Sequence, residues 1–190
     1  MAEHFAGMLA QEGPVRGLIG PREVERLWER HLLNCAALAE EVPRGIHLAD
    51  VGSGAGLPGL VIALARPDLR VTLIEPMLRR VTWLDEVIEA LDLAPRVRVV
   101  RGRADALHGR QAFEAVTARA VAALPLLLEW CLPLVAEGGA LLAMKGSRAE
   151  EEVADAASLL AERELAASVV EVGRGCLLDP TYVVRVVARA

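Results

Sequence analysis

The feature that most constrains this fold is a glycine-rich stretch between a short apolar run and a helical pattern. Residues 46–49 form a short and mostly apolar run, residues 50–59 read Asp-Val-Gly-Ser-Gly-Ala-Gly-Leu-Pro-Gly, and residues 60–65 have helical spacing. Glycine allows positive φ angles and lets a ligand approach the backbone closely. The first turn of a helix adds N–H groups that have no partner within the helix. The stretch therefore predicts a strand, a tight turn and a helix N-terminus that together face a polar ligand.

Apolar runs of strand length alternate with helical patterns along the rest of the chain. The runs that predict strands cover residues 46–49, 71–74, 97–100, 113–118, 140–144, 168–172 and 182–187. The patterns that predict helices cover residues 21–41, 60–65, 78–91, 122–135 and 147–164. This alternation predicts a parallel α/β sheet that is covered by helices and ends in a hairpin.

Three of these helices carry further signals. The helix at residues 21–41 has one apolar face, formed at helical spacing by Val24, Trp28, Leu32, Cys35 and Ala39. His31 lies near this face, where it fits either a packed core histidine or a pocket residue. Gly138-Gly139 is expected to end the helix at residues 122–135. Ser147 and Glu150 have capping-box spacing for the helix that follows.

The composition indicates one compact cytoplasmic domain. The chain has 190 residues, of which 54% are hydrophobic and 3% aromatic, so its core is expected to consist mainly of Leu, Val and Ala. Cys35, Cys131 and Cys176 are far apart and odd in number, which predicts free thiols in a reducing compartment and no zinc site. No apolar run reaches the length of a membrane span, and the N-terminal residues lack a secretory-signal pattern.

The net charge of −5 argues mildly against a nucleic-acid partner, because phosphate binding depends on Lys and Arg. A local basic patch is still compatible with this charge. Lys145 is the only lysine, and arginine, which suits bidentate phosphate contacts, supplies the other basic side chains. The arginines that are candidates for RNA contact, or alternatively for solvated surface, are Arg79, Arg80, Arg96, Arg98, Arg101 and Arg103.

Charged residues follow several of the predicted strands. In an open α/β sheet, ligands bind beyond the carboxyl ends of the strands. The charged side chains expected at that edge are Asp50, Glu75, Asp105, Arg119 and Lys145. Glu75 comes about 20 residues after the glycine turn, which is the spacing at which an acid binds the two hydroxyl groups of a ribose. We therefore expect a nucleoside cofactor whose ribose carries no phosphate.

The glycines by themselves fit two cofactors. Residues 54–59 match the dinucleotide fingerprint, whereas residues 52–56 match the tighter turn of S-adenosylmethionine sites. Asp50 favours S-adenosylmethionine, because an acid before the turn can meet the ammonium and sulfonium groups of that cofactor. A dinucleotide would place a pyrophosphate near the same carboxylate.

Motifs along most of the chain narrow this choice. They are Arg30-His31-Leu32-Leu33-Asn34, residues 50–59, Glu75-Pro76-Met77-Leu78-Arg79-Arg80, Arg103-Ala104-Asp105, Arg119-Ala120 and Lys145-Gly146. In this order they resemble the class I methyltransferases, and more closely the GidB (RsmG) enzymes, which methylate N7 of a guanosine in small-subunit ribosomal RNA. The resemblance implies a Rossmann-like α/β fold with a seven-stranded, mostly parallel sheet, a terminal antiparallel hairpin and helices on both faces.

The resemblance also implies the site residues and partners. S-adenosylmethionine is expected to bind beside Gly52, Gly54, Leu57, Glu75, Ala104, Asp105 and Arg119. The RNA is expected to contact His31, Arg119 and Lys145. The partner would be 16S ribosomal RNA, free or within a 30S subunit or assembly intermediate, and the enzyme is expected to be a monomer without a metal. Residues 1–44 would form a helical extension and residues 45–190 the methyltransferase domain.

Methylation of guanine N7 needs no general base, because this nitrogen carries a free lone pair. The enzyme has only to hold nitrogen, methyl group and sulfur in line. No catalytic acid or base is therefore expected, and Arg119 is assigned to cofactor, phosphate or base contact. Two alternatives remain open: a methyltransferase for a small molecule, which the negative charge would suit, and an NAD-binding dehydrogenase.

Overall fold

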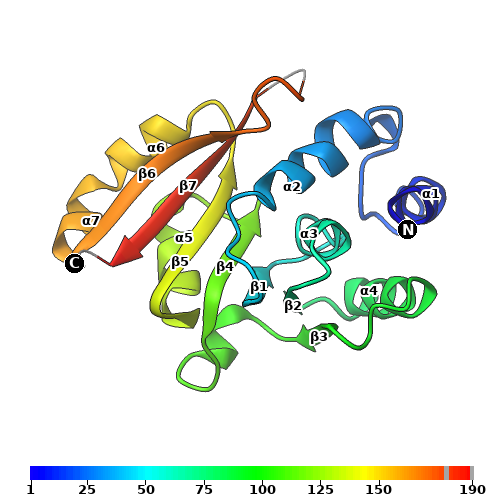
Figure 1. The fold of residues 1–190 in the computed structure, drawn as a ribbon, viewed down its shortest axis with the longest axis horizontal. Coiled ribbons are helices and arrows are strands. Elements are labelled where there is room, and N and C mark those ends of the chain that lie inside the picture. Colours follow the sequence, from blue (N-terminus) through cyan, green and yellow to red (C-terminus); the bar gives the residue numbers. More distant parts are fainter. Residues whose placement is uncertain (178–179, 189–190) are drawn as a thin grey trace.

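Seven strands form one mixed sheet in the computed structural model, which describes residues 1–177 and 180–188 (Figure 1). In chain order they are β1 (His47–Val51), β2 (Arg70–Glu75), β3 (Val97–Arg101), β4 (Phe113–Arg119), β5 (Val135–Lys145), β6 (Leu165–Val172) and β7 (Thr181–Ala188). Their order across the sheet is β3-β2-β1-β4-β5-β7-β6. Strand β7 runs antiparallel to β5 and β6, and the other neighbouring strands are parallel. The predicted α/β sheet with its terminal hairpin is confirmed.

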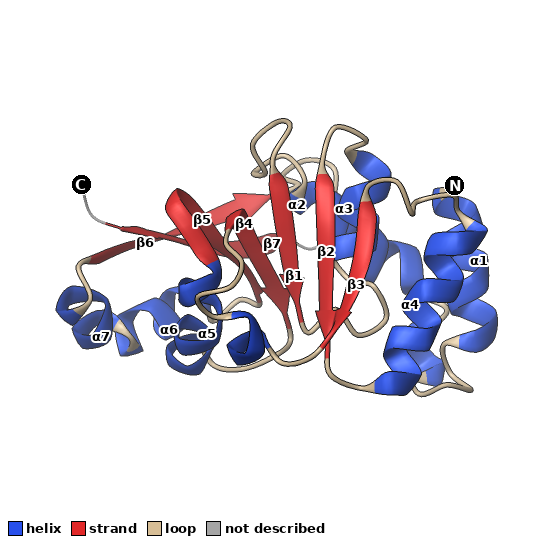
Figure 2. Cartoon of the chain, turned by 90° about the horizontal axis from the view of Figure 1, so that it is seen from below, coloured by secondary structure: helices blue, strands red, loops and turns tan. Residues whose placement is uncertain are grey.

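Helices lie on both sides of this sheet (Figure 2). On one side are α1 (Ala2–Glu12), α2 (Leu33–Leu38), α3 (Gly59–Ala65) and α4 (Leu78–Ala90). On the other are α5 (Leu124–Cys131), α6 (Ala149–Asp155) and α7 (Ala157–Glu162). The shorter elements are the 3-10 helices η1 (Pro21–Glu23), η3 (Ala104–Leu107) and η4 (Leu132–Leu134) and the π-helix η2 (Leu27–Leu32).

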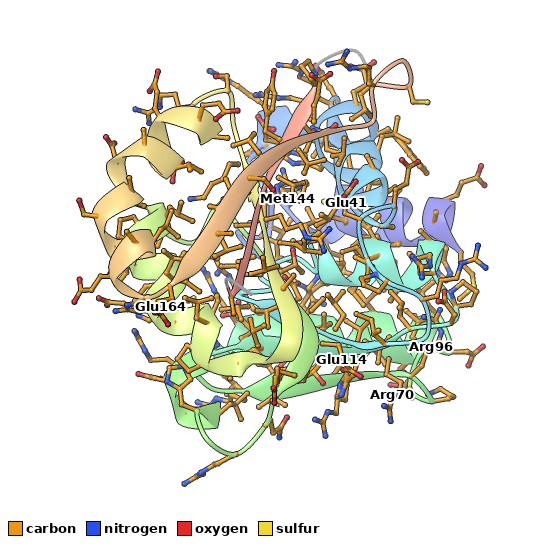
Figure 3. The ribbon with its side chains drawn as sticks, turned by 60° about the vertical axis from the view of Figure 1, so that its left-hand side comes forward. Glu41, Arg70, Arg96, Glu114, Met144 and Glu164 are labelled. Carbon is orange, nitrogen blue, oxygen red and sulfur yellow. The ribbon has the colours of Figure 1, made fainter. Side chains whose placement is uncertain are left out.

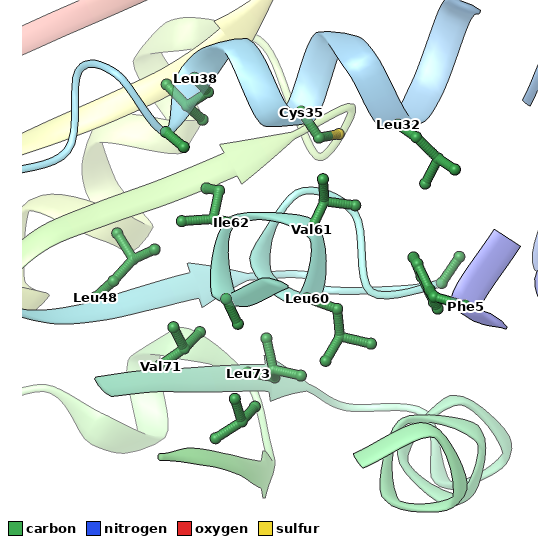
Figure 4. Close-up of a cluster of buried hydrophobic side chains, with 14 of the residues drawn as sticks. Phe5, Leu32, Cys35, Leu38, Leu48, Leu60, Val61, Ile62, Val71 and Leu73 are labelled. Carbon is green, nitrogen blue, oxygen red and sulfur yellow. The ribbon is translucent and has the colours of Figure 1, made fainter. Parts of the chain in front are cut away.

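Successive side chains of each strand point to opposite faces of the sheet, and this alternation divides the core into two hydrophobic clusters. In β1, Leu48 belongs to the cluster beneath α1–α4, and Ala49 belongs to the cluster beneath α5–α7. Figure 4 shows the first cluster, to which Leu48 and Leu73 of the sheet and Leu60 and Ile62 of α3 belong. A fully buried leucine or isoleucine stabilises the fold by about 2 kcal/mol. Strands that are buried on both faces explain the near-continuous apolar runs in the sequence.

The N-terminal segment differs from the single helix predicted over residues 21–41. It contains the 3-10 helix η1, the π-helix η2 and the short α2. A π-helix has a wider turn than an α-helix, so a 3.6-residue period assigns the wrong residues to the core. Leu27 is 3% exposed and Trp28 is 42% exposed, so the prediction that Trp28 is buried was wrong.

Two predicted helix boundaries were also wrong. Helix α5 ends at Cys131, the 3-10 helix η4 ends at Leu134 and β5 begins at Val135, so Gly138-Gly139 lies within a strand. Gly138 has a φ angle of 74°, and the pairing of β4 with β5 shifts register opposite this segment, which is the pattern of a β-bulge. Helix α6 begins at Ala149 without a side-chain cap, so Ser147 makes no capping box.

The predicted extension shares its core with the sheet. Phe5 and Leu9 of α1 and Leu32 of η2 lie in the same hydrophobic cluster as Leu48 and Leu73. The division between residues 44 and 45 stays a prediction, and residues 178–179 and 189–190 of the predicted methyltransferase domain lie outside the described residues. Within residues 1–177 and 180–188, no helix combines the length and the apolar character needed to cross a membrane.

Two glycine-to-alanine substitutions test the packing around the glycine turn. A Cβ atom at Gly59 would lie 2.5 Å from Leu73 and 2.6 Å from the Asp50 carboxylate, so we expect Gly59→Ala to lower the free energy of unfolding by about 1–3 kcal/mol. A Cβ atom at Gly7 in α1 meets nothing within 4 Å, so Gly7→Ala should raise it by about 0.5–1 kcal/mol. Urea unfolding of both variants makes the comparison. Equal effects would contradict the packing described here.

Candidate functional site

Two cavities open at the carboxyl edge of the sheet. The smaller has a volume of about 270 Å³ and is lined by the ends of β1, β2 and β3 and by Trp130 of α5. The larger has a volume of about 870 Å³ and is lined by the N-terminal segment, by the ends of β4 and β5 and by Glu152 of α6. Ala120 and Val121 line both cavities. A ligand in one cavity can therefore approach a ligand in the other at this shared wall.

A buried carboxylate lies at the wall of the smaller cavity. Glu75 ends β2 and is 1% exposed. Its Oε2 accepts a hydrogen bond from the Gly54 N–H at 2.9 Å, and its Oε1 accepts one from the Met77 N–H at 2.9 Å. Arg80 lies 3.7 Å from the same carboxylate. Each carboxylate oxygen can accept a second hydrogen bond, so Glu75 is fixed in place and retains acceptor capacity for a ligand.

Asp50 is placed differently from the prediction. It is fully buried within β1, and its Oδ2 accepts a hydrogen bond from the Gly59 N–H at 3.1 Å. It is not among the described residues that line the two cavities. Burial raises the pKa of this carboxyl group to about 7. Asp50 therefore holds the first turn of α3, and its predicted contact with the cations of the cofactor has no support in this placement.

The shared wall depends on a left-handed residue. Ala120 has a φ angle of 54°, a conformation that non-glycine residues adopt at a cost of about 1–2 kcal/mol. The turn at Ala120 follows Arg119 and precedes Val121, whose side chain lies against the glycine turn, because a Cβ atom at Gly52 would be 2.9 Å from it. Strain of this kind is frequent at functional sites.

Arg119 lines the larger cavity. Its NH1 group donates a hydrogen bond to the Cys35 Sγ at 3.1 Å, and its NH2 group donates to His31 Nδ1. NH2 also lies 3.5 Å from the Arg30 carbonyl oxygen. None of these partners is a carboxylate, and no ion pair joins Arg119 to another described residue. The guanidinium is thus fixed in position while its charge is available to an anion.

The contacts of His31 define its tautomer. A guanidinium can only donate, so Nδ1 accepts from Arg119 and the proton lies on Nε2, which donates to Glu23 Oε2 at 2.7 Å. Burial and the neighbouring Arg119 lower the pKa of His31 below 6.5, although Glu23 opposes them. His31 is therefore a neutral member of a chain of contacts from Glu23 to Arg119 at the wall of the larger cavity.

Lys145 is engaged within the protein. Its ammonium group donates to Glu152 Oε2 at 2.6 Å and to the Ala122 carbonyl oxygen at 2.8 Å, and its side chain is 9% exposed. Glu152 also accepts a hydrogen bond from the Leu124 N–H at 3.1 Å. These contacts join the end of β5 to α6 and to the loop after β4. The charge of Lys145 is already balanced on this side of the larger cavity.

The other predicted cofactor residues divide into two groups. Gly52, Ala104 and Asp105 line the smaller cavity together with Glu75. Gly54 and Leu57 are not among the described residues that line either cavity: Gly54 binds Glu75, and Leu57 packs against the first hydrophobic cluster. Their assignment to the cofactor stays a prediction.

Two arginines proposed for RNA contact serve the fold instead. Arg96 donates to the Ala63 carbonyl oxygen at 2.6 Å. Arg98 donates to Thr72 Oγ1 at 3.0 Å and to Gln111 Oε1 at 2.8 Å. Figure 3 labels Arg96 far from Met144, a residue that lines the larger cavity. The prediction of Arg96 and Arg98 as RNA contacts is therefore not supported by their placement.

Several residues of the site were missed from the sequence. Trp130 lines the smaller cavity and lies 5.5 Å below the Arg103 guanidinium, but an aromatic residue in an apolar helix gave no signal of a site. Glu23, Arg26 and Arg30 line the larger cavity. The four-residue spacing of Arg26 and Arg30 places both on one side of a helical segment and was a usable signal.

Comparisons with known proteins point to one family. The model of the family GidB, rRNA small subunit methyltransferase G, matches residues 1–176. A protein from Nocardioides sp., named ribosomal RNA small subunit methyltransferase G, is 57% identical over 188 residues, which cover 98% of this chain and 75% of the relative. A protein of the same name from Thermobifida fusca is 54% identical over 187 residues, with 98% and 78% covered.

A solved structure shows the same fold at low sequence identity. It is an O-methyltransferase from neocarzinostatin biosynthesis in complex with S-adenosyl-L-homocysteine. The match has a TM-score of 0.62 at 18% identity and covers 82% of this chain and 54% of that one.

Titration of His31 tests the contacts in the larger cavity. We expect its imidazole NMR signals to titrate below pH 6.5. Arg119→Gln removes a cation and should raise this pKa, whereas Glu23→Gln removes an anion and should lower it. Because an unfolded histidine titrates near 6.5, the unfolded state binds the proton more tightly, and His31 should destabilise the fold as the pH falls below that value. A midpoint that Arg119→Gln leaves unchanged would contradict the assigned contacts.

Proposed function

Because the chain belongs to the rRNA small subunit methyltransferase G family, we propose that it transfers a methyl group from S-adenosylmethionine to N7 of a guanosine in 16S ribosomal RNA. The observation that carries this proposal is the pair of cavities that meet at Ala120 and Val121. One contains a buried acid suited to a ribose, and the other is larger and contains the guanidinium of Arg119. The dehydrogenase alternative has no support in this family.

The residues of the smaller cavity fit S-adenosylmethionine. The Glu75 carboxylate can accept hydrogen bonds from the ribose hydroxyl groups, each worth about 1.5–3 kcal/mol because the acceptor is charged. Ile74, Met77, Ala104 and Trp130 give the cavity apolar walls for an adenine ring. S-adenosylmethionine carries no phosphate, so its binding would place no second negative charge of that kind beside the Glu75 carboxylate.

Methyl transfer to guanine N7 requires little of the protein beyond alignment of the reacting atoms. When bound, S-adenosylmethionine supplies a methyl group on a positively charged sulfur. The N7 lone pair forms the new bond to the methyl carbon, and the electron pair of the broken carbon–sulfur bond stays on sulfur, so no proton moves. The chain has to orient the base toward the shared wall and to exclude water there.

The residues of the larger cavity agree with a mechanism that uses no general base. His31 is the only imidazole among its described lining residues, and both ring nitrogens are engaged by Glu23 and Arg119. A guanidinium does not give up its proton in proteins. Arg119 is therefore assigned to an anion, either the carboxylate of the cofactor or an RNA phosphate, and not to proton transfer.

Substitution of Glu75 tests the cofactor site. We expect Glu75→Ala to weaken binding of S-adenosylhomocysteine at least tenfold, which corresponds to about 1.4 kcal/mol, since the ribose loses its acceptor. Glu75→Gln should have a smaller effect because one acceptor oxygen remains. Calorimetry measures the affinities, and Glu89→Gln on the exposed surface of α4 is the control. Unchanged affinity in a folded Glu75→Ala variant would remove Glu75 from the ribose.

Methyl transfer to ribosomal RNA tests the substrate. The chain is incubated with tritiated S-adenosylmethionine and 30S subunits, or free 16S RNA, from a strain that lacks the endogenous activity. We expect label in 16S RNA that is recovered as N7-methylguanosine after digestion to nucleosides. Label in another nucleoside would contradict the N7 assignment. Absence of label from free RNA, subunits and assembly intermediates would contradict the RNA substrate.

A further inference from the structure

The two sides of the larger cavity differ in whether their charged side chains are paired within the protein. On the side formed by β5 and α6, Lys145 and Glu152 neutralise each other at 2.6 Å. On the side formed by the N-terminal segment, Arg26 and Arg30 line the same cavity with exposed side chains. Among the described lining residues, the second side therefore offers positive charge that is open to solvent, whereas the charge of Lys145 is neutralised.

Arg26 and Arg30 have little to hold them within the protein. No hydrogen bond or ion pair joins the Arg26 guanidinium to any residue of the described ranges. Arg30 lies 3.8 Å from Glu23, with half of its side chain exposed. That carboxylate makes its shorter contact, at 2.7 Å, with His31. Both guanidinium groups therefore remain available to an external anion.

The backbone places the two arginines one turn apart on the same side. The Arg30 N–H donates to the Arg26 carbonyl oxygen at 2.8 Å at the start of the π-helix. Residues four apart in a helical segment have Cβ atoms about 5–6 Å from each other. Arg119 lies behind them at the end of β4 and contacts the Arg30 carbonyl oxygen. The three guanidinium groups thus come from two elements and border one cavity.

We propose that Arg26 and Arg30 bind the RNA backbone at the phosphates beside the target guanosine. This proposal rests on the proposed function, because it assigns the larger cavity to a nucleotide. Arginine suits phosphate oxygens, since its planar fork donates two parallel hydrogen bonds. Phosphate contacts position a nucleic acid without reading its sequence. The RNA would then cross the N-terminal segment and present one nucleotide to the shared wall.

Acidic residues near Arg26 and Arg30 limit the proposed RNA contact to the two arginine side chains. Glu23 and Glu29 line the same side of the cavity. Glu23 is engaged by His31, whereas Glu29 is exposed and would repel a phosphate. The RNA backbone is therefore expected to contact the guanidinium groups and not the surface as a whole. This agrees with the negative net charge of the chain.

The salt dependence of RNA binding tests this proposal. Affinity for 30S subunits from the strain without the endogenous activity is measured by filter binding at several salt concentrations. Each phosphate contact contributes about 0.7–1 to the slope of log affinity against log salt. We expect Arg26→Gln and Arg30→Gln each to reduce the slope by that amount and Arg26→Lys to retain it, because the charge is kept. Arg22→Gln, an exposed arginine in η1 outside the cavity, is the matched control.

Kinetics separate a phosphate contact from damage to the fold. The Gln variants should raise the KM for 30S subunits severalfold and leave kcat and the affinity for S-adenosylhomocysteine unchanged. A slope and KM equal to those of Arg22→Gln would overturn the proposal even if the wild-type chain methylates RNA. If the wild-type chain transfers no methyl group but the slopes still change, the phosphate contact stands and the proposed function fails.

Discussion

The site depends on two buried carboxylates that fix the glycine turn from opposite ends. Asp50 in β1 accepts the N–H of Gly59, and Glu75 in β2 accepts the N–H of Gly54. Loss of either hydrogen bond inside the protein would leave the remaining partner unsatisfied, which costs about 1–3 kcal/mol. The turn is therefore held between neighbouring strands, and the position of the smaller cavity follows from it.

The larger cavity shows how one chain can be acidic overall and still offer positive charge locally. Its Lys145 and Glu152 neutralise each other, and its Glu23 is bound to His31. Arg119 is held by His31 and Cys35, neither of which carries a negative charge here, because burial raises the pKa of the Cys35 thiol to about 11. Positive charge thus concentrates on the side that the N-terminal segment contributes. A net charge of −5 does not reveal this separation.

The sequence was sufficient to predict the structural elements that local sequence patterns determine. Buried parallel strands require apolar runs, and the spacing between the glycine turn and Glu75 is set by one strand–helix–strand unit. The resemblance to a family supplied the number of strands and the terminal antiparallel hairpin, whereas the order of the strands across the sheet was not predicted. Glu75 was predicted correctly as a side chain at the carboxyl edge, and the structure places it there with its carboxylate at a cavity wall.

The errors arose where a contact depends on distant parts of the chain. The π-helix changes the hydrogen-bonding pattern without changing the composition, so Trp28 was predicted to be buried, whereas the structure buries its neighbour Leu27. Asp50 was assigned to a ligand because the sequence does not show that Gly59 turns its N–H group toward it. The ion pair of Lys145 with Glu152 was not predicted, because this partner in α6 is brought close only by the fold, and RNA contact by Lys145 stays a prediction.

A crystal structure of the chain with S-adenosylhomocysteine would show directly where the two ligands meet. We expect the ribose hydroxyl groups on the Glu75 carboxylate, the adenine between the apolar walls of the smaller cavity, and the sulfur at Ala120 and Val121, open to the larger cavity. A molecule bound away from Glu75, or one whose sulfur points away from the larger cavity, would contradict this arrangement of the two cavities.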